Sequence, residues 1–276
     1  MIADLWSKAF GRNFDIRYWK WRFEDNPNDK KIYASYIVDD DMMTAYYAVS
    51  PTTLYIGGKS FQSGLMNMIM THPDFQKKGY SVEIELALHE VIKNEGFHAV
   101  YGFANHQAHR LHRKHAGWQD LAILNIMKCM KKDFRGLAVK NYEKLSFESG
   151  KISTEVIRKT EGMIVTKNRV WLSRDSRNLI WRLYDNPVYE YYHMTIKQSE
   201  KTAGVIFFKY YQDTVDVMEF FFGTTVEQTE IFGAGLRRIF EQGTVKAINL
   251  WSNLHMKEHL YLEKLGFVEA EIRLHL

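Results

Sequence analysis

The sequence reads M-T-H-P-D-F-Q-K-K-G-Y-S from Met70 to Ser81, and this stretch predicts a strand, a loop and a helix in succession. The apolar run that leads into it has the length of a strand and stops at His72-Pro73, because proline has no N–H to give to a sheet. From Gly79 onward the apolar period becomes helical. The apolar face expected for this helix consists of Ile84, Ala87, Leu88 and Val91.

The loop in the middle of this stretch predicts an anion-binding site. Backbone N–H groups are free where a loop turns into a helix, and the positive end of the helix dipole points to the same place. A solvated basic turn is the alternative, because many α/β domains open a helix with glycine and a few lysines. The residues expected to hold the anion are Gln76, Lys77, Lys78, Gly79, Tyr80 and Ser81.

The order of elements after the loop supports the anion site. A helix to Asn94 is followed by a strand at 99–103, by Asn105, and by a further helix that ends near Gly117-Trp118. The loop and this order resemble the GNAT superfamily of acyl-CoA-dependent N-acyltransferases, whose phosphate loop reads Q/R-x-x-G-x-G/A; here Ser81 replaces the last small residue. The resemblance covers about residues 60 to 128. It implies an α/β fold with a central mixed β-sheet flanked by helices, and acetyl-CoA as co-substrate.

The resemblance also implies where acetyl-CoA would lie. In proteins of this superfamily the pantetheine arm pairs with the strand before the loop, and the diphosphate takes N–H groups from the loop itself. Asn105, at the start of the later helix, is expected to contribute to the same cofactor site. The full set of expected cofactor contacts is Ile69, Met70, Thr71, the loop from Gln76 to Ser81, and Asn105.

The proton donor for the departing thiolate is expected on the helix after Asn105. Members of the superfamily commonly use a tyrosine there, and at the matching place this chain has His112. A histidine can serve because it titrates near neutral pH. The helix carries one residue more before its glycine than the usual pattern, so Arg113 competes for the position. The sequence shows no convincing general base.

Composition and charge bound the class of protein. The chain has 276 residues, which favours two domains, and a net charge of +4, which does not argue for nucleic acid. Cys129 stands alone, so no internal disulfide can form, and a reducing compartment is expected. We find no apolar run long enough for a membrane span and no signal peptide, so a cytoplasmic protein without a membrane partner is expected.

An internal repeat gives the domain organisation. W-R-F-E-D-N-P at 21–27 recurs as W-R-L-Y-D-N-P at 181–187, and strands, helix and strand follow in the same order. We therefore expect tandem GNAT-like domains: residues 1–140, which bind acetyl-CoA, and residues 150–276, which are structural or bind the acceptor. The second copy reads G-T-T-V-E at 223–227, without a basic residue, and is expected to have lost nucleotide binding.

Three functions are consistent with these features. The first is acetyl transfer from acetyl-CoA to a primary amine of a small molecule, with an amino sugar or sugar nucleotide as the suggested acceptor. The second is a non-catalytic acyl-CoA-binding or regulatory module, and the third is aminoacyl transfer from a charged tRNA by the basic helix at 106–115. The four histidines of that helix lack a cysteine or carboxylate cluster, so no metal site is expected. The oligomeric state is left open.

Overall fold

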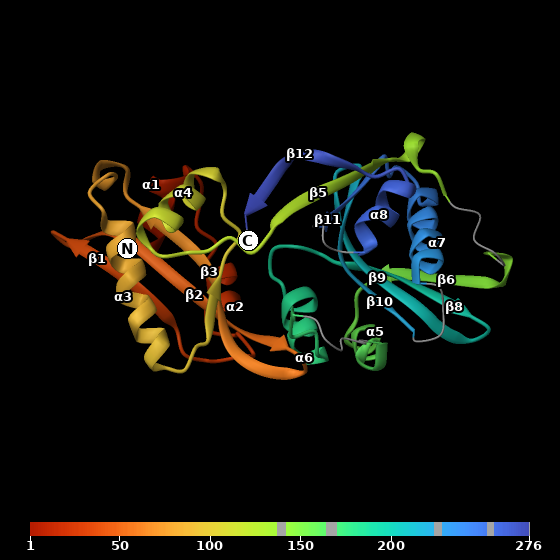
Figure 1. Ribbon diagram of the computed structural model, residues 1–276, viewed down its shortest axis with the longest axis horizontal. Coiled ribbons are helices and arrows are strands. Elements are labelled where there is room, and N and C mark those ends of the chain that lie inside the picture. The colour runs from red at the N-terminus through yellow and green to blue at the C-terminus, as the bar shows by residue number, and fades with distance from the viewer. Residues whose placement is uncertain (137–141, 164–169, 224–227, 253–256, 276) are drawn as a thin grey trace. The chain divides into compact units, whose positions relative to one another are not determined.

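The computed structural model describes residues 1–275 except 137–141, 164–169, 224–227 and 253–256. The chain divides into two compact units (Figure 1). Unit 1 comprises residues 1–121 and 166–173 with the last two residues of the chain, and unit 2 comprises residues 122–165 and 174–274. Among the described residues, no helix is both long enough and apolar enough to cross a membrane.

Unit 1 is a mixed sheet with helices on both faces. Its described strands have the order β1-β2-β3-β4, and β7 pairs with β2. Figure 1 shows β1, β2 and β3 side by side with α3 lying along them. The elements are α1 (Ile2–Phe10), α2 (Ile16–Phe23), β1 (Tyr33–Asp39), β2 (Met42–Ile56), β3 (Lys59–Thr71), η1 (Pro73–Phe75), α3 (Tyr80–Asn94), β4 (Ala99–Tyr101), α4 (His106–His115) and β7 (Val170–Leu172).

Strand β2 is buried from Met43 to Pro51, which is consistent with the apolar run from Ala45 to Val49. Successive side chains of a strand point to opposite faces. Tyr47 accordingly packs in one core with Leu88 of α3, and its neighbour Tyr46 packs in another core with Phe23 of α2. The sheet is therefore enclosed by α3 on one face and by α1 and α2 on the other.

The second half of β3 is separated from β4. The two strands pair in parallel only from Ser63 to Leu65, opposite Ala99 to Tyr101. Beyond this point β3 carries a β-bulge near Met68, whose φ is +53°, and it continues to pair only with β2. A bulge increases the twist of its strand and redirects it. Among the described residues, the edge of β3 from 66 to 71 has no strand partner on the side of β4.

The helix α3 has the predicted length but a different buried face. It runs from Tyr80 to Asn94, and Ile84 and Leu88 are buried as expected. The sequence prediction is wrong for Ala87 and Val91, which are exposed. The buried stripe instead lies slightly to one side and consists of Ile84, Glu85, Leu88 and Ile92. A carboxylate is thus part of the face that packs on the protein.

Unit 2 contains a seven-stranded sheet of the order β12-β5-β11-β10-β9-β8-β6. One face packs against α7 and α8, and the other packs against α5 and the α6–η5 segment. The elements are β5 (Ile123–Met130), η2 (Lys131–Asp133), η3 (Tyr142–Lys144), β6 (Leu145–Lys151), α5 (Thr154–Arg158), η4 (Glu161–Met163), α6 (Ser176–Leu179), the π-helical η5 (Ile180–Tyr184), β8 (Tyr192–Gln198), β9 (Lys201–Tyr211), β10 (Thr214–Phe222), α7 (Gln228–Glu241), β11 (Ala247–Ser252), α8 (Lys257–Lys264) and β12 (Val268–His275).

The units divide earlier than the sequence suggested. The boundary was expected between residues 140 and 150, whereas unit 2 already begins at Ala122. The reason is strand β5, which pairs antiparallel with β11 from Met130 opposite Ala247 to Asn125 opposite Ser252. Its hydrogen bonds therefore join it to the sheet of unit 2. A pairing across more than 100 positions leaves no local pattern in the sequence.

The two units share several local structures. Asn26 donates its side-chain amide to the carbonyl of Arg22 at 3.4 Å, and Asn186 donates to Arg182 at 3.4 Å. Strand β10 pairs in parallel with β11 over three residues, as β3 does with β4. Strand β10 also carries a bulge, at Met218, as β3 does near Met68. The repeated sequence thus forms the same turn in both units. Residues 224–227, which belong to the segment of unit 2 that corresponds to the loop before α3, lie outside the described residues.

Candidate active site

The loop before α3 exposes a row of backbone N–H groups. Lys77 and Gly79 have φ values of +64° and +88°, and Gly79 is the N-cap residue of α3. The carbonyl of Gly79 accepts from the N–H groups of Val82 and Glu83, which starts the helix. No described protein group accepts from the N–H groups of residues 77–81. These groups and the helix dipole together form an environment that suits a phosphate.

The strand that leads to this loop presents both a core residue and accessible backbone. Met70 is only 3% exposed and packs in the core beside α1 and α2, whereas Ile69 and Thr71 are partly exposed. All three lie on the part of β3 beyond its pairing with β4. Their peptide groups on that edge can therefore pair with an extended amide-containing ligand, which is how a strand adds to a sheet edge.

Asn105 forms the N-cap of α4. Its Oδ1 accepts from the N–H of Ala108 at 2.9 Å, which satisfies one of the free donors of the helix. The side chain is exposed. The structure thus gives this residue a capping role, and its contact with a cofactor stays a prediction.

His112 of α4 is buried and bound to Glu85 of α3. Its Nδ1 lies 3.0 and 2.9 Å from the two carboxylate oxygens of Glu85. The residues are 1% and 0% exposed. A carboxylate only accepts, so the imidazole donates from Nδ1–H. Trp118 donates its indole N–H to Oε1 of the same carboxylate at 2.6 Å.

A second histidine adjoins this group. Nε2 of His89 lies 3.1 Å from the hydroxyl of Tyr47, and its ring lies 6.1 Å from that of Trp118. Burial lowers the pKa of His89, although the charge of Glu85 opposes the shift. Burial, reinforced by Glu85, raises the pKa of the Tyr47 hydroxyl. Both side chains are therefore neutral at neutral pH.

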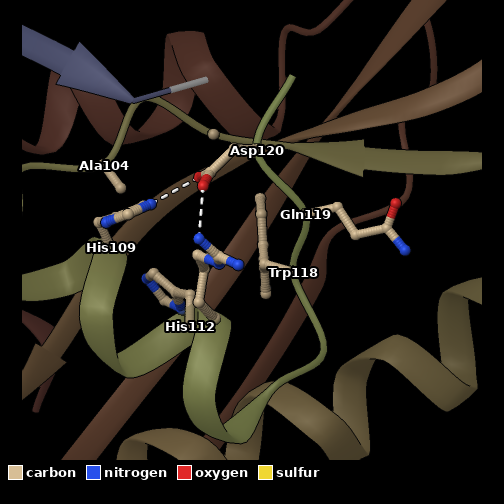
Figure 2. A pocket seen from close by; sticks show the side chains of 8 residues that line it. Ala104, His109, His112, Trp118, Gln119 and Asp120 are labelled. Atoms are coloured by element: carbon tan, nitrogen blue, oxygen red, sulfur yellow. Dashed lines mark hydrogen bonds and ion pairs between the residues drawn. The ribbon is translucent and has the colours of Figure 1, made fainter. Parts of the chain in front are cut away.

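Arg113 faces a different partner from His112. Its guanidinium donates to Oδ2 of Asp120 at 2.8 Å, and its side chain is 56% exposed. His109 lies 2.5 Å from Oδ1 of the same carboxylate. Figure 2 shows the side chain of His109 pointing to Asp120. His112, by contrast, is buried, and its Nε2 has no hydrogen-bond partner among the described residues.

A small cavity of about 20 Å³ lies beside these residues (Figure 2). This is space for about one water molecule. Gly102 lines it just after β4, where a Cβ would come within 2.8 Å of Met66 and 3.4 Å of Trp118. The cavity therefore adjoins the point at which β3 and β4 separate. Its lining consists of Gly102, Ala104, His109, His112, Arg113, Trp118, Gln119 and Asp120.

The histidines of α4 do not converge on one point. His109 contacts Asp120 and His112 contacts Glu85, so two of the four are directed to different carboxylates. Within the described ranges of the chain, no group of three or more histidine, cysteine, aspartate or glutamate side chains could hold a metal ion.

The sequence matches that of a known domain family. Residues 1–118 match the family model of the acetyltransferase (GNAT) domain. Residues 1–118 are a GNAT acetyltransferase domain. The GNAT domain thus contains the loop before α3, the free edge of β3 and the buried pair of Glu85 and His112.

Solved structures share the fold of the whole chain. A probable N-acyltransferase from Enterococcus faecalis aligns with a TM-score of 0.74 and 14% identity, over 99% of this chain and 67% of that one. A GCN5-related N-acetyltransferase from Anabaena variabilis has a TM-score of 0.69 and 14% identity, over 99% and 68%. Eis1 from Mycobacterium abscessus has a TM-score of 0.63 and 11% identity, over 98% and 67%. The chain spans about two thirds of these proteins. No curated protein matches the sequence.

The most informative residue that sequence analysis missed in the GNAT domain is Glu85. It stands beside the apolar stripe of α3, next to Ile84 and three residues before Leu88. A glutamate at that angle is compatible with an exposed helix flank, so its position alone carries no signal of burial. The sequence places Trp118 just after the helix, but it does not reveal the hydrogen bond of this residue to Glu85.

Proposed function

We propose that this protein transfers an acetyl group from acetyl-CoA to a primary amine of a small molecule, with an amino sugar or sugar nucleotide as the first candidate acceptor. The observation that carries the proposal is that a free strand edge and a loop with free N–H groups follow one another in unit 1. The unpaired edge of β3 from 66 to 71 leads directly into the loop whose N–H groups have no described acceptor. An extended amide arm that ends in a diphosphate fits this order of groups.

The roles of the individual residues follow from this placement. Ile69, Met70 and Thr71 would pair with the pantetheine arm through their backbone, and the loop from Gln76 to Ser81 would hold the diphosphate. His112 would supply the proton to the departing thiolate, because it lines the cavity where β3 and β4 separate. Arg113 is the weaker candidate, since Asp120 already holds its guanidinium.

A thermal-shift titration tests the first part of the proposal. A ligand that binds only the folded state raises its melting temperature in proportion to the logarithm of its concentration above Kd. Acetyl-CoA and coenzyme A should raise the melting temperature, whereas pantetheine, which lacks the diphosphate, should have a much smaller effect. Equal shifts with all three compounds, or none with any, would contradict the assignment of the loop.

Release of free thiol tests the second part. The wild-type protein should release coenzyme A from acetyl-CoA when glucosamine, ethanolamine, lysine or spermidine is present, with glucosamine as the expected best acceptor. The product should be the N-acetylated amine by mass spectrometry. Stabilisation by acetyl-CoA without thiol release from any amine would instead favour a non-catalytic acyl-CoA-binding module. Salt-dependent binding of tRNA would favour the aminoacyl-transfer alternative.

A further inference from the structure

The pair formed by Glu85 and His112 has no explanation in packing alone. Removing a carboxylate from water has a large desolvation penalty, and apolar replacements of buried charged groups and their partners are often neutral or stabilising. The carboxylate is nevertheless fully buried and accepts from two donors, His112 and Trp118. A contact between α3 and α4 that served stability only could be made by apolar side chains.

Unit 2 makes the corresponding contact without a carboxylate. The buried apolar residues of α3 and α7 have the same spacing of four, which aligns the two helices. Ile84, Leu88 and Ile92 correspond to Phe232, Leu236 and Phe240, each 148 positions later. By this alignment Gly233 stands in unit 2 where Glu85 stands in unit 1.

The histidine is replaced as well. Tyr261 stands five residues before Gly266, as His112 stands five residues before Gly117. Its hydroxyl donates to the backbone carbonyl of Thr229, and a Cβ on Gly233 would lie only 2.9 Å from that hydroxyl. A tyrosine and a glycine thus fill the space that a carboxylate and an imidazole fill in unit 1. The acid–imidazole pair belongs to the unit with the basic phosphate loop.

The second ring nitrogen of His112 is left for chemistry. Its Nδ1 is held by Glu85, while Nε2 is buried and has no hydrogen-bond partner among the described residues. Leaving a buried polar atom unpaired destabilises a fold. His112 also lines the cavity where Gly102 meets Met66, at the end of the free edge of β3. A reacting group that follows this edge therefore arrives beside the imidazole.

We propose that Glu85 is a positioning residue that makes His112 both the base and the acid of the acyl transfer. This inference rests on the proposed function. With Nδ1–H donated to Glu85, the neutral imidazole has its lone pair on Nε2. The same arrangement orients the histidine of serine hydrolases. It supplies the general base that the sequence did not reveal.

The proton balance of the reaction closes with this single histidine. An acceptor that arrives as an ammonium ion first loses one proton to solvent. The amine nitrogen then attacks the thioester carbonyl carbon, the N–C bond forms, and Nε2 of His112 takes the proton of that nitrogen, directly or through one water. The C–S bond breaks, and the thiolate of coenzyme A takes the proton back from Nε2. The products are the amide and free coenzyme A, and the imidazole is neutral again.

The surroundings of the pair are defined by three elements. From α3, His89 faces the same carboxylate, and from β2 the hydroxyl of Tyr47 binds His89. On α4 itself, His109 and Arg113 are held by Asp120 at the rim of the cavity. Described residues of unit 1 thus place one carboxylate, Glu85, in direct contact with the imidazole of His112.

Two substitutions and one control test the proposed roles of Glu85 and His112. Glu85→Gln keeps an acceptor for Nδ1–H but removes the charge, and His112→Gln removes the titrating group. Glu90→Gln, on the exposed side of the same helix, removes an equal charge without contact to the imidazole. We expect kcat to fall by about 10²–10⁴-fold in His112→Gln and by at least about tenfold in Glu85→Gln, with a normal kcat in the control. The thermal shift given by acetyl-CoA should remain in all three.

Two further readouts distinguish a catalytic role of Glu85 and His112 from a merely structural one. In Glu85→Gln the acidic limb of the kcat/KM profile should move to lower pH, because a contacting carboxylate favours the protonated imidazole. In the wild type, long-range ¹H–¹⁵N spectra should show His112 protonated at Nδ1 and unprotonated at Nε2. A neutral imidazole of His112 with its proton on Nε2, in the enzyme without ligand, would overturn the proposal. A wild-type kcat in both Glu85→Gln and His112→Gln would also overturn it. Absence of thiol release from the wild type would instead overturn the proposed function.

Discussion

Trp118 donates its indole N–H to Oε1 of Glu85 at 2.6 Å, although the two residues are 33 positions apart in the chain. The bond joins the segment after α4 to the middle of α3 and fixes the carboxylate that also binds His112. A hydrogen bond to a charged group contributes about 1.5–3 kcal/mol. The connection between α3 and α4 is thus polar at its centre.

Trp118→Phe should destabilise unit 1 by about 1.5–3 kcal/mol, because the phenyl ring keeps most of the packing but gives no donor to the buried carboxylate. The measurement is the urea unfolding midpoint. Trp251→Phe serves as the control, since that indole is half exposed. Equal midpoints for the two variants would show that the bond to Glu85 contributes nothing to stability.

Gly79→Ala should weaken the binding of acetyl-CoA. Gly79 has a φ of +88°, which an L-residue adopts at a penalty of about 1–2 kcal/mol, so the loop would rearrange. Gly96→Ala is a matched control, because Gly96 has a φ of +85° at the other end of α3 and equal open space around its Cα. Both variants should melt at lower temperature, and only Gly79→Ala should lose the shift given by acetyl-CoA. Loss in both, or in neither, would speak against a specific role of the loop.

The repeated turn should be more important in unit 1 than in unit 2. Asn26 is completely buried, and its side chain donates to Pro51 at 3.0 Å and accepts from the N–H of Asn28. Asn26→Ala would leave these groups unpaired and should destabilise the fold by about 1–3 kcal/mol. Asn186→Ala, at a partly exposed site, should have a smaller effect in the same urea experiment. The reverse order would contradict this account of the two turns.

The stability of unit 2 should fall in mild acid because of His193. Burial lowers the pKa of this imidazole, with Lys159 in support and Glu148 opposed. Below its ordinary pKa of 6.5 the unfolded chain binds the proton more readily, so stability is present above that pH and is lost as the pH falls through the lowered value. His193→Gln can keep a hydrogen bond to Thr195 and should flatten this slope between pH 7.5 and 5.

The control for the pH experiment is His115→Gln, since His115 is exposed at the end of α4. Its urea midpoints should follow those of the wild type at every pH. An unchanged slope in His193→Gln would assign the acid sensitivity to other groups.

Local patterns predicted the elements that depend on neighbouring residues. The predicted end of the strand before Pro73 is confirmed by β3, and the predicted helix from Gly79 to Asn94 is confirmed by α3, because proline and the helical period act within a few residues. These features follow from chemistry within a few residues.

Distant pairing was not predictable from the same patterns. The entry of β5 into the sheet of unit 2 and the pairing of β7 with β2 join segments more than 100 positions apart. The burial of Glu85 depends on two donors from α4 and the segment after it, so the sequence of α3 alone does not reveal it.

The most direct test of the central claim is a crystal structure of this protein with coenzyme A. Our account predicts the diphosphate within hydrogen-bonding distance of the backbone N–H groups of residues 77–81, the pantetheine arm along β3 at Ile69 to Thr71, and the thiol beside His112. A diphosphate at the start of α7 in unit 2, or a thiol remote from the cavity at Gly102, would contradict it.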